Sequence, residues 1–196
     1  MTGSVALVLA GGETLWDDLD DLEAMMGGAW PGVVIVCNDV GFAEAVWPEE
    51  HKGRRWDGPL HHWATLHAEK GNRWKQRREK AGLDMNLTTW SSVRRTIIDR
   101  HFAGWTKGSS GLYGVSVALR GLGCPRAIGC GIPMDGGRNT FSGKKWNAFQ
   151  RYRRGWLDED NGVPQTLRSR FRSMSGWTRE TFGAPTVDWI GLVHMR

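Results

Sequence analysis

Three short loops of this sequence carry residue types that can hold a phosphorylated or hydroxylated ligand. The first is Gly11-Gly12-Glu13-Thr14-Leu15, directly after an apolar run. Glycines let backbone N–H groups come close to a phosphate, and the start of a helix adds partial positive charge. The loop matches neither the GxGxxG fingerprint nor the P-loop, which needs Lys followed by Ser or Thr. A tight strand-to-helix turn without any ligand explains the glycine pair equally well.

The second loop is Cys37-Asn38-Asp39, at the end of another apolar run. The amide of Asn38 offers a donor and an acceptor together, which suits a sugar diol or the edge of a base. Asp39 is a candidate ligand for a metal or a sugar. An Asn-Asp turn that caps the following segment is the alternative. We favour the ligand-binding interpretation because the third loop repeats the position.

The third loop begins a predicted helix with Ser109, Ser110 and Gly111, and Asp135 follows the next apolar run. Hydroxyls and free N–H groups at the start of a helix can hold a phosphate or a carboxylate. A carboxylate in the position of Asp135 can bind Mg²⁺, bind a ribose hydroxyl or accept a proton. A serine N-cap without ligand and a solvated aspartate are the alternatives.

Three histidines, His61, His62 and His67, fall within one short segment. In a strand, His61 and His67 share a face but lie about 20 Å apart, which argues against a common zinc site. His67 ends the predicted strand at the same edge as Asn38, so it is a candidate general base or phosphate ligand. A partly buried histidine with a structural hydrogen bond is the more common alternative.

Strands and helices alternate around these loops. Strands are predicted at 4–10, 33–37, 61–67, 126–130 and 171–175. Helices are predicted at 14–26, 69–81, 111–122, 144–157 and 177–182, whereas 92–102 is ambiguous. The first strand, glycine turn, helix and second strand form a right-handed βαβ unit with a parallel pair. We therefore predict an α/β fold, a single Rossmann-like three-layer domain over 1–196 with a mostly parallel sheet.

The charge distribution points to an anionic partner. The chain has 26 basic and 21 acidic residues, a formal charge of +5, and 138–196 is a basic, Trp-rich portion that completes the domain. A basic surface suits nucleotides, sugar phosphates or nucleic acid, although a merely basic surface is as common. Most of the 12 tryptophans are expected in the core, while those beside Arg or Lys, such as Trp146 and Trp177, can stack on bases or cations.

Cysteine usage and hydropathy indicate the compartment. The three cysteines are an odd number, and Cys37 and Cys130 lie in apolar runs, which is typical of reduced thiols in a cytosolic protein. The apolar run at 5–10 is too short for a signal peptide, and no segment reaches membrane-spanning length. We expect a cytoplasmic protein without membrane contact.

The stretch GSSGLYGVSVALRGLGCPRAIGCGIPMD resembles the corresponding part of the Rossmann-like bacterial sialyltransferases and of the 6-hydroxymethylpterin diphosphokinase-like proteins. VALVLAGGETLWDD and VVIVCNDVG resemble their first two strand-and-loop units, and FRSMSGWTRETFG is similar to their last strand. The resemblance implies a nucleotide held by the loops at 11–15, 38–39 and 109–111. Where the families have Gly-Pro-Ser-Leu, this chain has Glu13, which would repel a phosphate, bind it through a metal or point away. TLHAEK and SMSGWTRE also resemble strings in small phage-encoded proteins, for which the location is the host cytoplasm.

These observations favour a nucleotide- or nucleotide-sugar-dependent transferase that transfers a glycosyl, phosphoryl or diphosphoryl group. The candidate nucleotide ligands are Gly11, Gly12, Thr14, Asn38, Ser109, Ser110 and Gly111. Asp39 and Asp135 are candidate Mg²⁺ ligands, and His67 or Asp135 would handle the proton of the acceptor. The alternative is a non-catalytic protein that binds nucleic acid or a partner through the basic C-terminal portion, including Arg151, Arg153 and Arg154.

Overall fold

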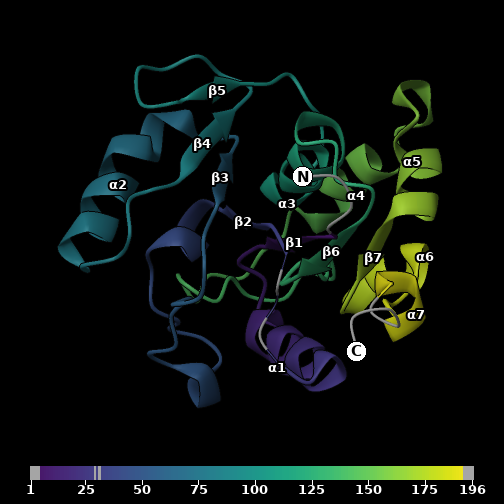
Figure 1. The fold of residues 1–196 in the computed structure, drawn as a ribbon, viewed down its shortest axis with the longest axis horizontal. Coiled ribbons are helices and arrows are strands. Elements are labelled where there is room, and N and C mark those ends of the chain that lie inside the picture. The colour runs from purple at the N-terminus through teal and green to yellow at the C-terminus, as the bar shows by residue number, and fades with distance from the viewer. Residues whose placement is uncertain (1–4, 29, 31, 192–196) are drawn as a thin grey trace.

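A computed structural model of the chain describes residues 5–28, 30 and 32–191. Its centre is a seven-stranded sheet in the order β5-β4-β3-β2-β1-β6-β7, in which every strand pair is parallel (Figure 1). The strands are β1 (Ala6–Leu9), β2 (Val34–Cys37), β3 (His62–Thr65), β4 (Thr88–Ser91), β5 (Arg100–His101), β6 (Ala127–Cys130) and β7 (Phe171–Ser173). The predicted α/β class with a Rossmann-like parallel sheet is confirmed. Ser4, the first residue of the predicted strand 4–10, lies outside the described residues.

The central strands are buried on both faces, which explains their uninterrupted apolar sequences. All residues of β1 (ALVL) and β2 (VIVC) are buried. Leu7 pairs with Val34 on one side and with Ile128 on the other. Strands of this kind can be recognised from sequence because helices cover both faces and no polar alternation is possible.

Helices form the two outer layers. The helical segments are α1 (Leu15–Met26), α2 (Gly71–Lys80), α3 (Ser110–Ser116) with a π-helical continuation (Val117–Gly121), α4 (Phe149–Trp156), α5 (Val163–Arg170), α6 (Gly176–Phe182) and α7 (Val187–Ile190). Short 3-10 turns lie at Asn38–Gly41, Glu49–His51, Ala68–Lys70 and Glu159–Asn161. Side chains of α3, α4 and α5 pack in one core cluster, and those of α1, α2 and α7 pack in a second on the opposite face. Most tryptophans belong to or pack against these clusters, as expected.

Several predicted boundaries were wrong. The helix predicted at 144–157 begins only at Phe149, and 138–146 instead forms a short antiparallel hairpin that is closed by the bridge between Arg138 and Lys145. Strand β4 and helices α5 and α7 were not predicted. β4 has the short sequence TTWS, which lacks the apolar run that marked the central strands.

The order of the strands creates a topological switch point. From β1 the chain builds outward through β2, β3, β4 and β5, and then returns through α3 to place β6 on the other side of β1. In open α/β sheets, ligands bind outside the carboxyl ends of the strands at such a point. A ligand is therefore expected at the loops that follow β1 and β6.

No helix in the described part of the chain is long and apolar enough to cross a bilayer. The three cysteines are unpaired and buried. Burial raises the pKa of the Cys37 thiol to about 12 and also raises the pKa of Cys124 and Cys130.

These thiols are expected to react slowly with a thiolate-specific disulfide reagent in the native protein, because the thiolate is the nucleophile and burial disfavours it. All three should react at once after denaturation, which serves as the control. A rapid phase of one thiol equivalent in the native protein would contradict the burial of at least one cysteine.

Candidate functional site

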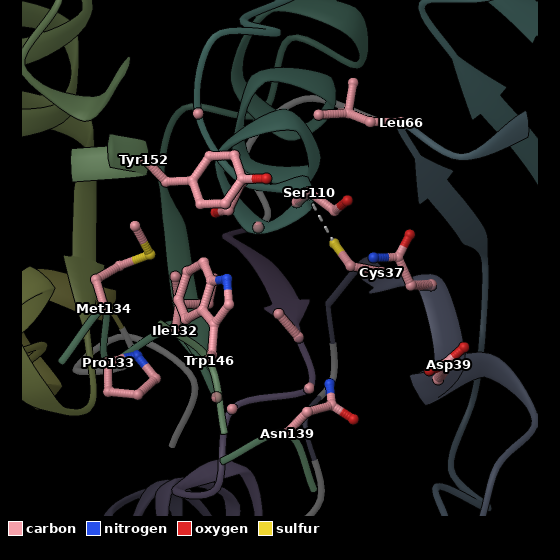
Figure 2. Close-up of a pocket in the computed structure, with 18 of the residues that line it drawn as sticks. Cys37, Asp39, Leu66, Ser110, Ile132, Pro133, Met134, Asn139, Trp146 and Tyr152 are labelled. Carbon is pink, nitrogen blue, oxygen red and sulfur yellow. Dashed lines mark hydrogen bonds between the residues drawn. The ribbon is translucent and has the colours of Figure 1, made fainter. Parts of the chain in front are cut away.

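A cavity of about 550 Å³ opens at the carboxyl edge of the sheet (Figure 2). The segments that line it follow β1, β2, β3 and β6 or precede α3, and the 138–146 hairpin with the start of α4 completes the wall. They are residues 10–12, 37–39, 66–67, 106, 108–111 and 131–134, with Arg138, Asn139, Ser142, Lys144, Lys145, Trp146 and Tyr152. The cavity thus occupies the switch point between β1 and β6.

The predicted residues divide between the cavity and its surroundings. Gly11, Gly12, Asn38, Asp39, His67, Ser109, Ser110 and Gly111 line the cavity. Thr14 and Asp135 are not among the lining residues. The three loops that the sequence singled out are therefore neighbours in space, although 100 residues separate the first from the third.

The floor of the cavity is a close contact between the loops after β1 and β6. The Gly12 N–H donates to the Gly131 carbonyl at 2.9 Å. A Cβ on Gly12 would lie 2.6 Å from the Gly131 oxygen and 2.6 Å from Pro133 Cδ, so only glycine fits there. Gly12 of the predicted phosphate loop therefore has a structural role, because it lets the two loop backbones touch.

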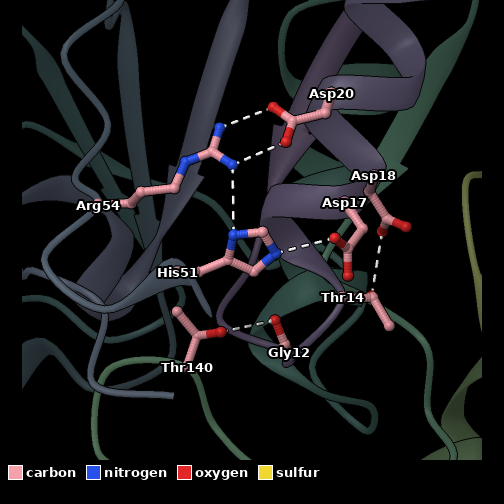
Figure 3. Close-up of polar contacts among 8 residues, drawn as sticks. All are labelled: Gly12, Thr14, Asp17, Asp18, Asp20, His51, Arg54 and Thr140. Atoms are coloured by element: carbon pink, nitrogen blue, oxygen red, sulfur yellow. Dashed lines mark hydrogen bonds and ion pairs between the residues drawn. The ribbon is translucent and has the colours of Figure 1, made fainter. Parts of the chain in front are cut away.

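Below this floor, the buried carboxylate of Asp18 joins three loops. Its Oδ2 accepts hydrogen bonds from the Gly131 N–H at 2.7 Å, the Ser175 hydroxyl at 2.8 Å and the Thr14 hydroxyl at 3.2 Å. The Asp18–Thr14 contact is drawn in Figure 3. Burial is the main cause that raises the Asp18 pKa to about 6, against the lowering effect of the three hydrogen bonds. Thr14 sits at the N-cap of α1, but its hydroxyl serves this network and makes no cap hydrogen bond.

Asn38 has a left-handed backbone conformation, with a φ of 52°. Its side-chain Oδ1 accepts from the Thr65 hydroxyl at 2.9 Å, and the Thr65 oxygen in turn accepts from the His67 N–H at 2.8 Å. The ends of β2 and β3 are thereby fixed to each other. Because Oδ1 is engaged, the Asn38 amide nitrogen is the group that remains for a ligand.

The start of α3 is attached to the end of β2. The Cys37 thiol donates to the Ser110 carbonyl at 3.3 Å (Figure 2). The Ser109 hydroxyl accepts from the Leu112 N–H at 3.4 Å, which is the N-cap role considered for it. Gly114 permits this approach, because a Cβ there would lie 2.6 Å from the Cys37 sulfur.

Two titratable groups line the cavity near β3. Burial raises the pKa of the Asp39 carboxyl, and the nearby Lys70 and Arg77 oppose that rise. The His67 side chain is 47% exposed, and its Nδ1 lies 3.4 Å from Glu69 Oε1. His67 is therefore accessible to a ligand in the cavity and has a carboxylate that can orient its ring.

The Asp135 carboxylate binds residues of α4 and α6, and Asp135 does not line the cavity. It accepts from Arg153 Nη2 at 3.1 Å and from the Trp177 N–H at 2.9 Å. Of the two candidate Mg²⁺ ligands, Asp39 lines the cavity and Asp135 does not. Among the described residues, no group of three or more His, Cys, Asp or Glu side chains is arranged to hold a metal. Asp39 is the one carboxylate among the described lining residues, and a single carboxylate does not make a Mg²⁺ site built by the protein.

The 138–146 hairpin was missed by sequence reasoning, and it brings new side chains to the cavity. Thr140 fastens it, since its N–H donates to the Gly11 carbonyl at 2.9 Å and its hydroxyl to the Gly12 carbonyl at 3.2 Å (Figure 3). Glu13 points away from the cavity and accepts from the Arg138 N–H at 2.8 Å and from Trp47 Nε1 at 3.2 Å. The hairpin thus lies beside the first loop because Glu13 and Thr140 bind it there.

An aromatic pair stands on one side of the cavity. The rings of Trp146 and Tyr152 are stacked, with centroids 5.6 Å apart and planes 25° apart. Figure 2 shows this pair on one side of the cavity, with Cys37 and Asp39 on the other. One sequence signal could have indicated the hairpin that carries Trp146. The glycines at 136, 137 and 143 are typical of turns and argue against a helix that begins at 144.

Comparison with known proteins identifies no relative: no family model matches the chain, and no curated protein or solved structure matches it significantly. The resemblance to the sialyltransferases and the pterin diphosphokinase-like proteins stays a prediction.

Proposed function

We propose that the cavity binds a nucleotide or a nucleotide-activated donor, from which the protein transfers a glycosyl or phosphoryl group. The observation that carries this proposal is the convergence of the loops after β1, β2, β3 and β6 on one cavity at the switch point of a parallel sheet. Its volume, about 550 Å³, lies in the range of small-molecule sites, which is roughly 300–1,000 Å³.

The charge of the cavity favours an anionic ligand. Arg138, Lys144 and Lys145 line it, whereas Asp39 is the only carboxylate among the described lining residues. In the described part of the chain, neither Lys144 nor Lys145 has a carboxylate within ion-pair distance. Both ammonium groups are thus available to a phosphate chain, and Trp146 offers an aromatic face for a base.

The transfer step would need a held phosphate and a positioned acceptor. In our proposal, His67 accepts the proton of the acceptor hydroxyl, while the lysines stabilise the negative charge on the departing phosphate. Asn38 binds a ligand oxygen through its amide nitrogen. Mg²⁺, if required, would arrive with the phosphates of the donor, since the protein supplies only Asp39.

A thermal-shift screen of nucleotides and nucleotide sugars, with and without Mg²⁺, tests the proposal. A ligand that binds only the folded state stabilises it by about 2.7 kcal/mol at 100 times its Kd, so Tm should rise. The Lys144→Gln/Lys145→Gln variant should bind about tenfold more weakly or worse, because a hydrogen bond to a charged group contributes about 1.5–3 kcal/mol. The matched control is Arg151→Gln/Arg154→Gln, which removes the same charge away from the cavity lining.

Failure of every nucleotide at millimolar concentration would rule the proposal out. Equal weakening by the lysine variant and by the arginine control would show that only net charge matters. If nucleotides bind but no transfer is found and His67→Gln binds normally, the pocket is correct and the catalytic step is not.

A cytoplasmic setting is part of the same proposal. The three buried and unpaired cysteines support it, since reduced thiols are usual in that compartment.

A further inference from the structure

Seven basic residues lie on the β5 side of the sheet, away from β6 and β7. They lie on α2, on the segment between β4 and β5, and on β5 itself: Arg73, Lys75, Arg77, Lys80, Arg94, Arg95 and Arg100. All are exposed except Lys75, which is half-buried. We call this set the basic edge.

The ribbons of α2, β4 and β5 lie beside one another on one side of the molecule (Figure 1). The buried Trp74 holds α2 on the sheet, where its ring stacks on Trp63 with centroids 5.7 Å apart. The segment after β4 packs against the start of α2, since a Cβ on Gly71 would lie 2.9 Å from Ile97. On α2 itself, Arg73, Arg77 and Lys80 follow helical spacing and share one face.

The residues of the basic edge make no ion-pair contacts in the described part of the chain. The acidic group on the same segment, Asp99, accepts from the Thr89 hydroxyl at 2.7 Å and the Thr89 N–H at 2.8 Å. Lys75 and Arg100 are near enough to help lower its pKa, but neither makes an ion-pair contact with it. Arg77 lies over the ring of Phe42 at 5.6 Å and near Asp39, where its charge opposes the rise in the Asp39 pKa without an ion-pair contact.

Several arginines of the C-terminal portion make contacts within the fold. Arg153, Arg170, Arg172 and Arg179 donate to backbone carbonyls and so stabilise the fold. Arg154 lines a small surface hollow together with Asp158, Glu159 and Asp160. Several cations of the C-terminal portion are therefore engaged by the fold, whereas none of the seven residues of the basic edge makes an ion pair in the described ranges.

We propose that the basic edge binds double-stranded nucleic acid through its phosphate backbone, without sequence preference. Arg73 and Arg77 are separated by about 6 Å along the helix axis, a spacing on the scale of successive phosphates. No Trp, Tyr or Phe belongs to the exposed set, so base stacking, which single-stranded ligands require, has no platform there. Phosphate contacts without base contacts confer affinity but not sequence discrimination.

Fluorescence anisotropy of a labelled DNA duplex of about 20 base pairs, titrated with the full-length protein at about 50 to 200 mM salt, tests this inference. Each lost phosphate contact should reduce the slope of log K against log salt by about 0.9. Two variants, Arg73→Gln/Arg77→Gln/Lys80→Gln and Arg94→Gln/Arg95→Gln/Arg100→Gln, should each reduce the slope by about 2 to 3 and weaken binding about tenfold or more.

The matched control is Arg151→Gln/Arg154→Gln/Arg168→Gln, which removes the same charge from exposed residues of the C-terminal portion. It should leave the slope unchanged. Absence of duplex binding by the wild type, or equal losses in the control and edge variants, would overturn the inference.

Two further results would also overturn it. If the charges serve only to prevent pairing of the edge strand with another sheet, the edge variants would aggregate and the slope of log K against log salt would not change. Binding to vesicles of anionic lipid but not to DNA would assign the surface to membranes instead. Neither result depends on whether a nucleotide binds the cavity.

Discussion

Replacement of Asp18 by asparagine is expected to remove a fall in stability that the wild type shows between about pH 4 and pH 7. Burial raises the folded-state pKa of Asp18 from 3.8 to about 6. The folded protein therefore binds a proton more tightly than the unfolded chain does, and this contribution is complete below pH 3.8 and lost as the pH rises through 6. At 1.36 kcal/mol for each pKa unit, the free energy of unfolding changes by about 3 kcal/mol.

The measurement is the free energy of unfolding by urea at a series of pH values for the wild type and Asp18→Asn. Since asparagine keeps an acceptor oxygen for the Gly131 N–H, the variant should gain about 3 kcal/mol relative to the wild type across this pH range. A difference between the two proteins that does not vary with pH would contradict the burial of an ionisable Asp18.

Asp20, two residues further along α1, is the matched control. Arg54 binds its carboxylate through two hydrogen bonds of 2.8 and 2.7 Å and lowers its pKa (Figure 3). Its stabilisation is present above the unfolded pKa and is lost as the pH falls, so Asp20→Asn should give the opposite pH dependence. Opposite signs from two aspartates on one helix cannot arise from net charge alone.

The fold was predictable where burial alone determines the sequence pattern. β1, β2 and β6 are covered by helices on both faces, and each gives an apolar run that ends in a glycine or an Asn-Asp pair. The ends of such strands meet at one edge, which is why Gly12, Asn38 and Ser110 could be assigned to one site. The polar strand β4 is the counterexample, because the hydrogen bonds of Thr89 to Asp99 and Ile97 stabilise it, rather than apolar periodicity.

The parts of the site that escaped prediction depend on contacts between distant segments. The 138–146 hairpin donates hydrogen bonds to the Gly11 and Gly12 carbonyls and to the Glu13 carboxylate, about 125 residues earlier in the chain. Asp135 follows β6 as expected, but the Arg153 guanidinium and the N-terminus of α6 hold it away from the cavity lining. Spacing in the sequence places a residue at the edge of a sheet without showing which neighbour its side chain will bind.

The second large effect is expected at Gly131, where Gly131→Ala should destabilise the protein by about 2–5 kcal/mol and abolish nucleotide binding. Gly131 has a φ of +67°, and a Cβ there would lie far inside van der Waals contact distance of the Ala10 carbonyl oxygen and 2.9 Å from Leu15 Cβ. The left-handed backbone alone costs an L-residue about 1–2 kcal/mol. The remainder comes from forcing the β1 and β6 loops apart.

Gly27→Ala separates these two costs. Gly27 has nearly the same φ, +69°, but nothing lies within 4 Å of its Cβ position, so this variant should lose only about 1–2 kcal/mol and keep its ligand. Urea unfolding and nucleotide titration of both variants measure the difference. Equal losses would mean that the loops move apart without cost and that the cavity floor is not rigid. A larger loss at Gly131 would show that the contact between the Gly131 loop and Gly12 sets the shape of the site. Gly131 is central to this contact, because its backbone has no room for a methyl group and its N–H donates to Asp18.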